Sequence, residues 1–285
     1  MTALTQIPWT ELTFAAAVFA VMLTFYILYR AAERSKRTLI MSNLEQLNLL
    51  RMLLADFQRH RGLSAGLISG DQSLREDLTR VRARIDQSIE QAQKLDTRHP
   101  NDWKALIAQW RALRADQNRD ADSNMQAHHQ LIRDTIFLIE DIASEVDLSC
   151  GRDELSYLIC IWHEVVQTAE WSGQARALGT GIAASRSSSA AQRVRLRFLH
   201  QKITHLSRAA FGTLQSSFAS KERLLHCQRA VDGFLHCIEQ ELLGIDNPSI
   251  EAKRYFDQAT GAINELLALV DAALNELHQL HGKQR

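Results

Sequence analysis

Apolar residues along most of the chain recur at spacings of three and four, the period of one face of an α-helix. The clearest series is Leu44, Leu47, Leu50, Leu54 and Phe57. Alternating apolar and polar runs rich in β-branched residues, which would indicate strands, do not occur in the sequence. Only 3 Pro and 12 Gly are present among 285 residues, so helix breakers are scarce. The pattern predicts an all-α chain.

Breaks in this period divide the chain into about eight helices. The first follows the apolar N-terminal segment and ends near Ser69, and the others begin near residues 73, 101, 125, 153, 190, 221 and 249. Residues 185–189 are a predicted loop, and residues 116–124 are a loop or a weak part of a helix. The clearest stop is 244–248, after which Ser249 is placed to cap the last helix.

One stretch near the N-terminus differs from the rest because it is continuously apolar. Leu12 to Tyr29 holds 18 residues without a charge, just enough to span a bilayer. The alternative, a cleaved signal peptide, needs a basic residue before the apolar stretch and small residues at a cleavage site. No Lys or Arg precedes the stretch. We therefore favour an uncleaved transmembrane anchor over residues 12–30, behind a short segment 1–11.

Flanking charges predict the orientation of this anchor. Glu11 is the only charged side chain before it, whereas four cations follow it closely, namely Arg30, Arg34, Lys36 and Arg37. Cytoplasmic loops carry the excess of Lys and Arg. The predicted location is the bacterial inner (cytoplasmic) membrane, with a single span and the helical domain of residues 31–285 in the cytoplasm.

Composition and motifs argue against several classes of function. The 33 basic and 33 acidic side chains balance, which gives no overall attraction to nucleic acid. The basic run Arg193–Arg197 is interpreted as a solvated helix face rather than an RNA site. No GxGxxG, P-loop or HExxH motif occurs. We therefore expect no catalytic residues and no cofactor, and the chain is not interpreted as an enzyme.

Cysteine and histidine spacing indicates no metal site. The four cysteines, Cys150, Cys160, Cys227 and Cys237, form no CxxC pair. His-Cys occurs twice, but the two pairs are ten residues apart, nearly three helical turns, so one metal cannot be reached from both. We expect these thiols to be buried in a reducing compartment. His163 and His200 are candidates for a phosphotransfer adaptor, although neither lies in a phosphotransfer signature.

Two segments that lie 115 residues apart resemble each other. Residues 61–68, RGLSAGLI, match residues 176–183, RALGTGIA, in an Arg followed by small residues and a branched apolar pair. Such self-similarity suggests two related halves, and eight helices in two halves suggest two four-helix bundles or one elongated array. Small residues let helices approach closely. An Arg beside such a contact needs an acceptor, either a carboxylate or a bound anion.

The segment FQRHRGLSAGLISGD, residues 57–71, resembles the first signature of the nitrate- and nitrite-sensing (NIT) domain family, whose usual form is close to QRERGLSA. AEWSGQARALGTG, residues 169–181, is similar to the second signature, and residues 249–263 resemble the final helix. Together the matches span about residues 40–280. The resemblance implies an all-helical domain of two four-helix bundles that senses nitrate or nitrite by binding the anion with arginines.

Carried over by position, the resemblance implies that Arg59, Arg61 and Arg176 bind the anion. A further arginine from a later helix is expected, with three open candidates, Arg208, Arg223 and Arg229. The sequence departs from the family pattern at His60, where Glu is usual. This departure leaves open which of residues 59–61 touches the anion.

We expect Arg61 and Arg176 to lie close together and to share one anion, because planar guanidiniums match a planar oxyanion. No carboxylate occupies equivalent positions in the two copies: Asp56 precedes Arg61 by five residues, and Trp171 stands at that place before Arg176. The alternative is that Arg59 and Arg61 pair with carboxylates such as Asp56.

The leading hypothesis is a membrane-anchored sensor of nitrate or nitrite that signals by helix rearrangement to a separate partner protein. The expected partners are therefore the anion, the lipid bilayer and a signalling protein, with a second copy of the chain as an open alternative. The runner-up is a non-catalytic helical scaffold that keeps the fold and has lost anion binding.

Overall fold

The computed structural model describes residues 9–68, 70–116, 120–150, 155–218, 220–245 and 247–282. Within these ranges the chain forms helices and no strand, which confirms the all-α prediction. Most of the predicted N-terminal segment, the helix end at Ser69 and the helix start near residue 153 lie outside the described residues. The chain divides into two compact units, residues 1–41 and 42–285.

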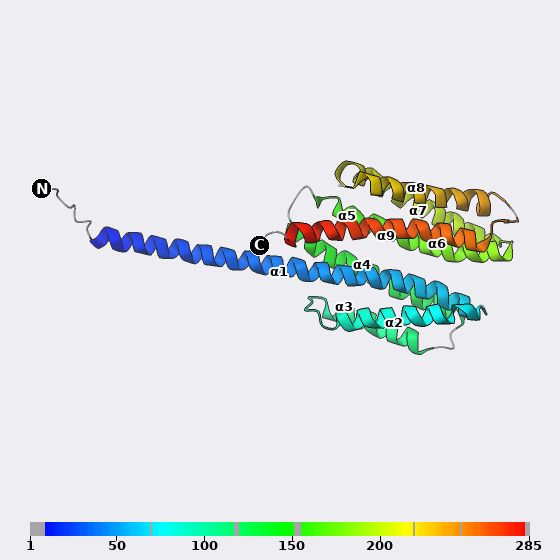
Figure 1. The fold of residues 1–285 in the computed structure, drawn as a ribbon, viewed down its shortest axis with the longest axis horizontal. Helices are drawn as coiled ribbons and strands as arrows, with labels where there is room; N and C mark the ends of the chain where they lie inside the picture. The colour runs from blue at the N-terminus through cyan, green and yellow to red at the C-terminus, as the bar shows by residue number, and fades with distance from the viewer. Residues whose placement is uncertain are drawn as a thin grey trace. The chain divides into compact units, whose positions relative to one another are not determined.

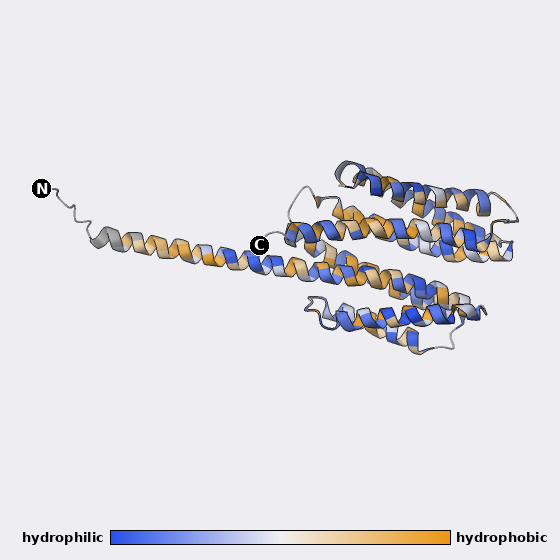
Figure 2. Ribbon diagram, in the orientation of Figure 1, coloured by the Kyte–Doolittle hydropathy of each residue, from blue (hydrophilic) through white to orange (hydrophobic). Residues whose placement is uncertain are grey.

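The first unit contains the beginning of helix α1 (Trp9–Ile68), where the apolar side chains are exposed. Phe14, Phe19 and Phe25 are 72%, 70% and 73% exposed. Figure 2 shows a nearly continuous hydrophobic run early in this helix, followed by hydrophilic residues. Soluble proteins rarely expose so large a contiguous apolar surface. By length and composition the helix can cross a membrane, and a signal sequence near the N-terminus would meet the same criteria.

The second unit begins with the remainder of α1 and contains two groups of helices (Figure 1). The first group comprises α1 from Ser42, a short turn η1 (Gln72–Leu74), α2 (Arg75–Ala92), α3 (Pro100–Ala115) and α4 (Ala121–Cys150). Its core contains the apolar series predicted on α1, from Leu44 to Phe57, each member of which is at most 1% exposed. The ring of Phe57 lies 5.7 Å from that of Trp110 on α3.

The second group comprises α5 (Leu158–Cys160), the π-helical turn η3 (Ile161–Val165), α6 (Val166–Ser185), α7 (Ala190–Ser217), α8 (Lys221–Ile238), a second π-helical turn η4 (Glu239–Leu243) and α9 (Ala252–Gly282). α5, η3 and α6 follow one another without a break, so they act as one helix. α6 and α8 each pack against both α7 and α9. This arrangement closes a second bundle and confirms the prediction of two four-helix bundles.

Helix ends agree with the predictions to within a few residues. α7 begins after Ser189, whose hydroxyl accepts from the Gln192 backbone N–H at 3.2 Å while the Gln192 side chain accepts from the Ser189 N–H at 2.8 Å. This capping box ends the loop predicted at 185–189, whose first residue, Ser185, is still the last residue of α6. α4 begins at Ala121, so the second part of the stretch 116–124 is helical. The last helix begins at Ala252, slightly after the predicted cap at Ser249.

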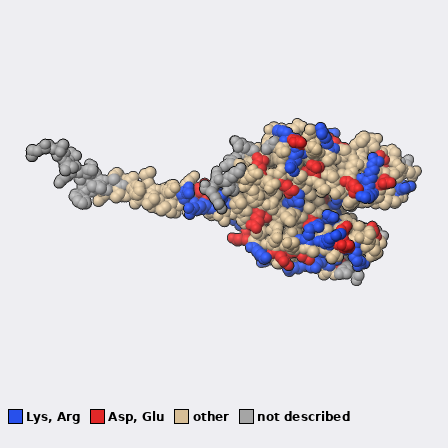
Figure 3. All heavy atoms as spheres, viewed as in Figure 1, with Lys and Arg blue, Asp and Glu red and all other residues tan. Residues whose placement is uncertain are grey.

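Polar side chains join the two bundles along a contact that we call the seam, defined as the contacts of α1 and α4 with η3, α6 and α9. Asn48 Nδ2 lies 2.9 Å from His278 Nε2 on α9, and Arg51 forms an ion pair with Asp271 on the same helix. Figure 3 shows that acidic and basic side chains also intersperse on the visible face of the second unit. The contact between the bundles therefore includes hydrogen bonds and an ion pair beside buried apolar side chains of α1 and α9.

Close packing of α6 on α9 depends on one glycine. The Tyr255 hydroxyl of α9 donates to the Ala175 carbonyl of α6 at 2.9 Å, and the Tyr255 ring is fully buried. A Cβ at Gly179 would lie 2.2 Å from that hydroxyl oxygen, far inside contact distance. Gly181, on the same helix, is exposed with no atom near its Cβ position. Of these two glycines in the RALGTGIA segment, Gly179 is the one that a neighbouring side chain requires.

We predict that Gly179→Ala lowers the free energy of unfolding by about 1–3 kcal/mol, because the buried Tyr255 must shift and strain the core. The matched control is Gly181→Ala on the same helix, which should stabilise the protein by about 0.4–1 kcal/mol. Thermal unfolding of the full chain in detergent, followed by circular dichroism, checks both variants. Equal unfolding temperatures for the two variants would contradict this account of the α6–α9 contact.

Candidate functional site

Arg61 lies on the seam and is almost fully buried, with 1% of its side chain exposed. Its guanidinium donates to Glu170 of α6 through two hydrogen bonds, Nη1 to Oε1 at 2.6 Å and Nη2 to Oε2 at 3.4 Å. Such a bidentate contact between a planar guanidinium and a planar carboxylate is among the strongest interactions between side chains. Arg61 therefore has a carboxylate partner, as in the alternative that the sequence left open, but the partner is Glu170 and not Asp56. Position-by-position comparison of the two repeats overlooked Glu170, because it pairs from the opposite repeat.

Two amides complete the surroundings of the Glu170 carboxylate. Gln58 Nε2 donates to Oε2 and Gln174 Nε2 donates to Oε1, each at 3.0 Å. Gln58 lies one turn before Arg61 on α1, and Gln174 lies one turn after Glu170 on α6, so helical spacing places both beside the pair. The carboxylate thus accepts from three side chains, which offsets part of the cost of burying its charge.

A second glycine leaves room for the Arg61 side chain. A Cβ at Gly173 would lie 2.8 Å from Arg61 Nη2. Gly173 belongs to the segment 169–181, together with Glu170 and Gln174. One turn and a half of α6 therefore supplies the carboxylate, an amide and the space that Arg61 occupies.

Arg176 is a largely buried guanidinium with neutral neighbours. Its Nη1 donates to the Thr260 hydroxyl of α9 at 3.0 Å, and its guanidinium carbon lies 4.9 Å from the centre of the Phe256 ring. In the described part of the chain, no carboxylate lies within ion-pair distance of it. Burial, then the charge of Arg61, lowers the pKa of Arg176 to about 10; Glu170 opposes this shift and Arg59 adds to it. An added anion would therefore stabilise charged Arg176.

The remaining predicted residues lie in different environments. Arg59 is exposed on α1, and its charge acts on Arg176. The alternative partner for Arg59 and Arg61, Asp56, instead pairs with Arg84 of α2. The three candidates for a later-helix arginine, Arg208, Arg223 and Arg229, are exposed on α7 and α8. The later helix that contacts Arg176 is α9, and it does so through Thr260 and Phe256.

Two further basic groups near Glu170 were not predicted. Arg195 of α7 donates to Gln174 Oε1 at 2.7 Å. Burial, followed by the charge of Arg61, lowers the pKa of His129 on α4, with Glu170 opposing and Arg195 adding to the shift. The hydrophobic period could not reveal either residue, because both lie on polar stretches of their helices.

His60 lies away from the seam, inside the first bundle, and belongs to a buried chain of hydrogen bonds. Arg82 Nε donates to His60 Nε2 at 3.2 Å, His60 Nδ1 lies 2.7 Å from His128 Nε2, and His128 Nδ1 lies 2.7 Å from the Asn124 carbonyl oxygen. Arginine is always a donor. It follows that His60 donates from Nδ1 to His128, which donates in turn to Asn124, with both imidazoles neutral.

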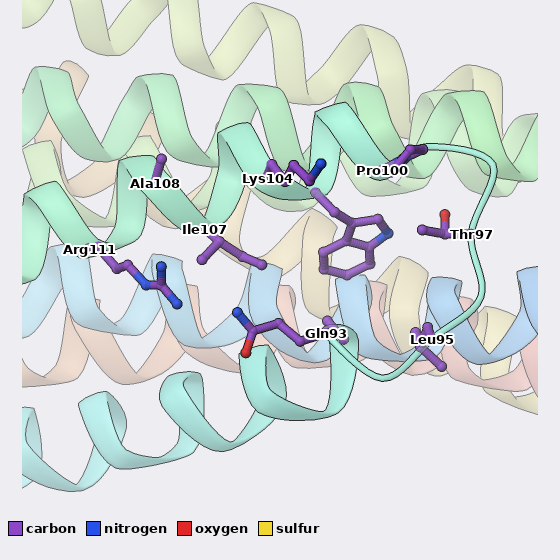
Figure 4. A pocket seen from close by; sticks show the side chains of 10 residues that line it. Gln93, Leu95, Thr97, Pro100, Lys104, Ile107, Ala108 and Arg111 are labelled. Atoms are coloured by element: carbon purple, nitrogen blue, oxygen red, sulfur yellow. The ribbon is translucent and has the colours of Figure 1, made fainter.

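The cysteines and the cavity in the described part of the chain do not belong to the cluster around Arg61. Three of the cysteines, Cys160, Cys227 and Cys237, are buried free thiols, as predicted, and the Cys150 side chain lies outside the described residues. Among the described residues, no group of three or more His, Cys, Asp or Glu is placed to hold a metal. A cavity of about 530 Å³ lies between α2 and α3 (Figure 4) and is lined by Trp103, Ile107, Lys104 and Arg111, among others. It shares no lining residue with the cluster around Arg61.

We predict that acid destabilises the protein through His60. Burial, then the charges of His128 and Arg82, lowers the pKa of His60 from 6.5 to about 3. Below pH 6.5 His60 is protonated in the unfolded chain but stays neutral in the folded chain. The free energy of unfolding therefore falls by up to about 1.4 kcal/mol per pH unit until the pH reaches about 3. His60→Gln should lower stability at pH 7 and flatten its fall towards pH 4.5.

Unfolding in denaturant at several pH values measures both slopes. The control is His205→Gln, which removes an exposed imidazole from α7 and leaves the buried chain intact. If wild type and His60→Gln lose stability in parallel as pH falls, the buried imidazole is not the acid-sensitive group.

Comparison with known proteins agrees with these features. A family model described as nitrate and nitrite sensing, NIT, matches residues 52–278. The chain is also similar to a solved structure described as the NasR transcription antiterminator, with a TM-score of 0.64 and 17% identity, covering 92% of this chain and 75% of that chain. At this identity the similarity demonstrates a shared fold. No curated protein matches the sequence.

Proposed function

Because the chain belongs to the NIT family of nitrate- and nitrite-sensing domains, we propose that it is a membrane-anchored sensor that binds one of these anions at the seam. Arg61 and Arg176 would bind the anion, with Arg59 adding positive charge at the exposed edge. The signal would pass to a separate protein by rearrangement of the two bundles. The chain has no role as a catalyst in this proposal.

The observation that carries the proposal is Arg176. A partly buried guanidinium between a hydroxyl and an aromatic ring, with Arg61 nearby, lacks a counter-charge of its own. Nitrate is a planar monoanion, and nitrite is a bent one, so each offers two oxygens to the parallel N–H groups of a guanidinium. Binding between charged groups in a site shielded from water strengthens each such hydrogen bond.

Anion binding at the seam can also act as a switch. Arg61 belongs to the first bundle and Arg176 to the second, so an anion held by both would contact both bundles. A ligand shifts a conformational equilibrium only by its difference in affinity for the two states. An anion that contacts both arginines at once favours the state in which they approach each other, and this supplies the difference.

We predict that Arg176→Ala weakens nitrate binding about tenfold or more, since hydrogen bonds to a charged group contribute roughly 1.5–3 kcal/mol. Arg176→Lys should restore only part of the affinity, because a single ammonium lacks the planar pair of donors. Calorimetric titration of the full chain in detergent measures both, with the exposed Arg208→Ala as the control that should bind as wild type does. Unchanged affinity in Arg176→Ala would place the anion elsewhere.

A second candidate function is the scaffold that has lost anion binding, and the Arg61–Glu170 pair favours it. An arginine already neutralised by an internal carboxylate does not need an external anion. This candidate predicts no heat of nitrate binding and no thermal stabilisation by nitrate in the wild-type chain. Ligand that binds the folded state alone must raise the unfolding temperature, so the same titration separates the two functions.

The membrane part of the proposal rests on the exposed apolar helix of the first unit and on the cations that follow it. We predict a single span with the helical domain in the cytoplasm. A fluorescent protein fused after Arg285 should fluoresce, and alkaline phosphatase fused at the same place should be inactive, because that enzyme requires export. Active phosphatase, or cleavage of the N-terminal segment, would contradict the prediction.

A further inference from the structure

The Glu170 carboxylate contacts the Arg61 guanidinium in the same way that a bound oxyanion would. Its two oxygens lie 2.6 and 3.4 Å from the two terminal nitrogens of the guanidinium, and the side chain is only 8% exposed. A carboxylate is a planar monoanion with its charge shared between oxygens, as nitrite and nitrate are. The amides of Gln58 and Gln174 bind the same two oxygens at 3.0 Å. The arrangement therefore resembles a small oxyanion site that is already filled by a side chain.

Positively charged side chains around Glu170 outnumber the negatively charged ones that contact them. Arg61 touches it directly, while Arg176 and Arg59 lie near enough for their charges to interact with this region. Arg195 reaches the same cluster through Gln174. In the described part of the chain, Glu170 is the one carboxylate that contacts Arg61. The cluster therefore keeps a surplus of positive charge that Glu170 reduces without cancelling.

We propose that Glu170 is an internal competitor that occupies the Arg61 guanidinium in the anion-free protein and is displaced when the oxyanion binds. This inference rests on the proposed function. Two anions cannot both take the same pair of N–H donors, and two like charges a few ångströms apart in a buried site repel strongly. Binding is therefore an exchange of one anion for another, and Glu170 sets the anion concentration at which the exchange occurs.

An exchange of this kind keeps Arg61 paired with an anion throughout, while the displaced Glu170 must turn to water or to another cation. Removing one member of a buried ion pair is strongly destabilising because the other charge is left uncompensated. With Glu170 in place, Arg61 stays neutralised in the resting protein, and the incoming oxyanion takes over that role. Because Glu170 belongs to α6 and Arg61 to α1, breaking their contact also removes a direct link between the two bundles. The competitor thus couples occupancy of the site to the contact across the seam.

The test is nitrate titration of Glu170→Gln beside wild type, as full chains in detergent. The amide keeps the size and one acceptor oxygen but carries no charge, so nitrate should bind about tenfold more tightly, equivalent to about 1.4 kcal/mol. The matched control is Glu140→Gln. Glu140 is another seam carboxylate, 17% exposed, and it contacts Gln167 and His163. Its variant should bind nitrate as wild type does.

A second variant, Glu170→Ala, tests the site without relying on nitrate. Truncation leaves a space beside Arg61 that formate can fill, so formate should raise the unfolding temperature of Glu170→Ala and leave that of wild type unchanged. The matched control is Glu140→Ala, which formate should not stabilise. This arm reports whether the Arg61 guanidinium accepts a free oxyanion once its internal partner is removed.

The outcomes separate the two proposals. Nitrate binding by wild type, with equal or weaker binding by Glu170→Gln, overturns the competitor and leaves the sensor function standing; Glu170 would then position Arg61. If neither protein binds nitrate or nitrite in such titrations, the sensor function is overturned, and formate then decides the rest. Stabilisation of Glu170→Ala by formate would support an anion site filled by Glu170, and its absence would overturn that as well.

Discussion

A guanidinium that is almost fully buried is costly without a partner of opposite charge, and Arg61 finds that partner across the boundary between two bundles. The contact with Glu170 joins α1 to α6, and the surrounding sequence serves it: Gln58 and Gln174 bind the carboxylate, and Gly173 leaves the space. Losing one partner of such a pair costs about 3–5 kcal/mol. The relation between the two bundles is therefore tied to which anion Arg61 holds.

The segment 59–61 shows how one helix serves three environments at once. Successive residues on an α-helix point about 100° apart, so Arg59 faces solvent, His60 faces the bundle interior and Arg61 faces the seam. The departure from the family pattern at His60 is thus accommodated inside the first bundle, by Arg82 and His128. It leaves the Arg61 contact unaffected. A residue next to an arginine in sequence need not share its chemistry.

Sequence periodicity predicted the helices because burial of apolar faces dominates their spacing, whereas the two bundles were expected from the internal repeat and the family resemblance. Leu44 to Phe57 are buried as their spacing requires, and Ser189 caps α7. The π-helical turns η3 and η4 were not predicted, because one extra residue barely changes the spacing of the apolar positions. The residues of the site were harder to predict from the sequence. Arg61 and Arg176 were identified through a family signature, whereas Glu170, Gln58 and Arg195 acquire their roles only when distant helices meet, and no local pattern encodes such a meeting. Of two adjacent histidines on α4, His128 binds His60, whereas His129 interacts with the charges of Arg61 and Glu170.

The contact of Tyr255 with Gly179 constrains how this sequence can evolve. Any side chain at 179 meets the hydroxyl and the ring atoms behind it, at 2.2–2.5 Å from a Cβ, so Phe in place of Tyr255 would relieve only part of the collision. A larger residue at 179 becomes tolerable once 255 has already become smaller than an aromatic ring. Either substitution alone is costly, since a smaller residue at 255 leaves a cavity and a larger one at 179 collides with the ring. Lineages that keep Tyr255 are therefore confined to glycine at 179, and variation at the two sites should appear jointly.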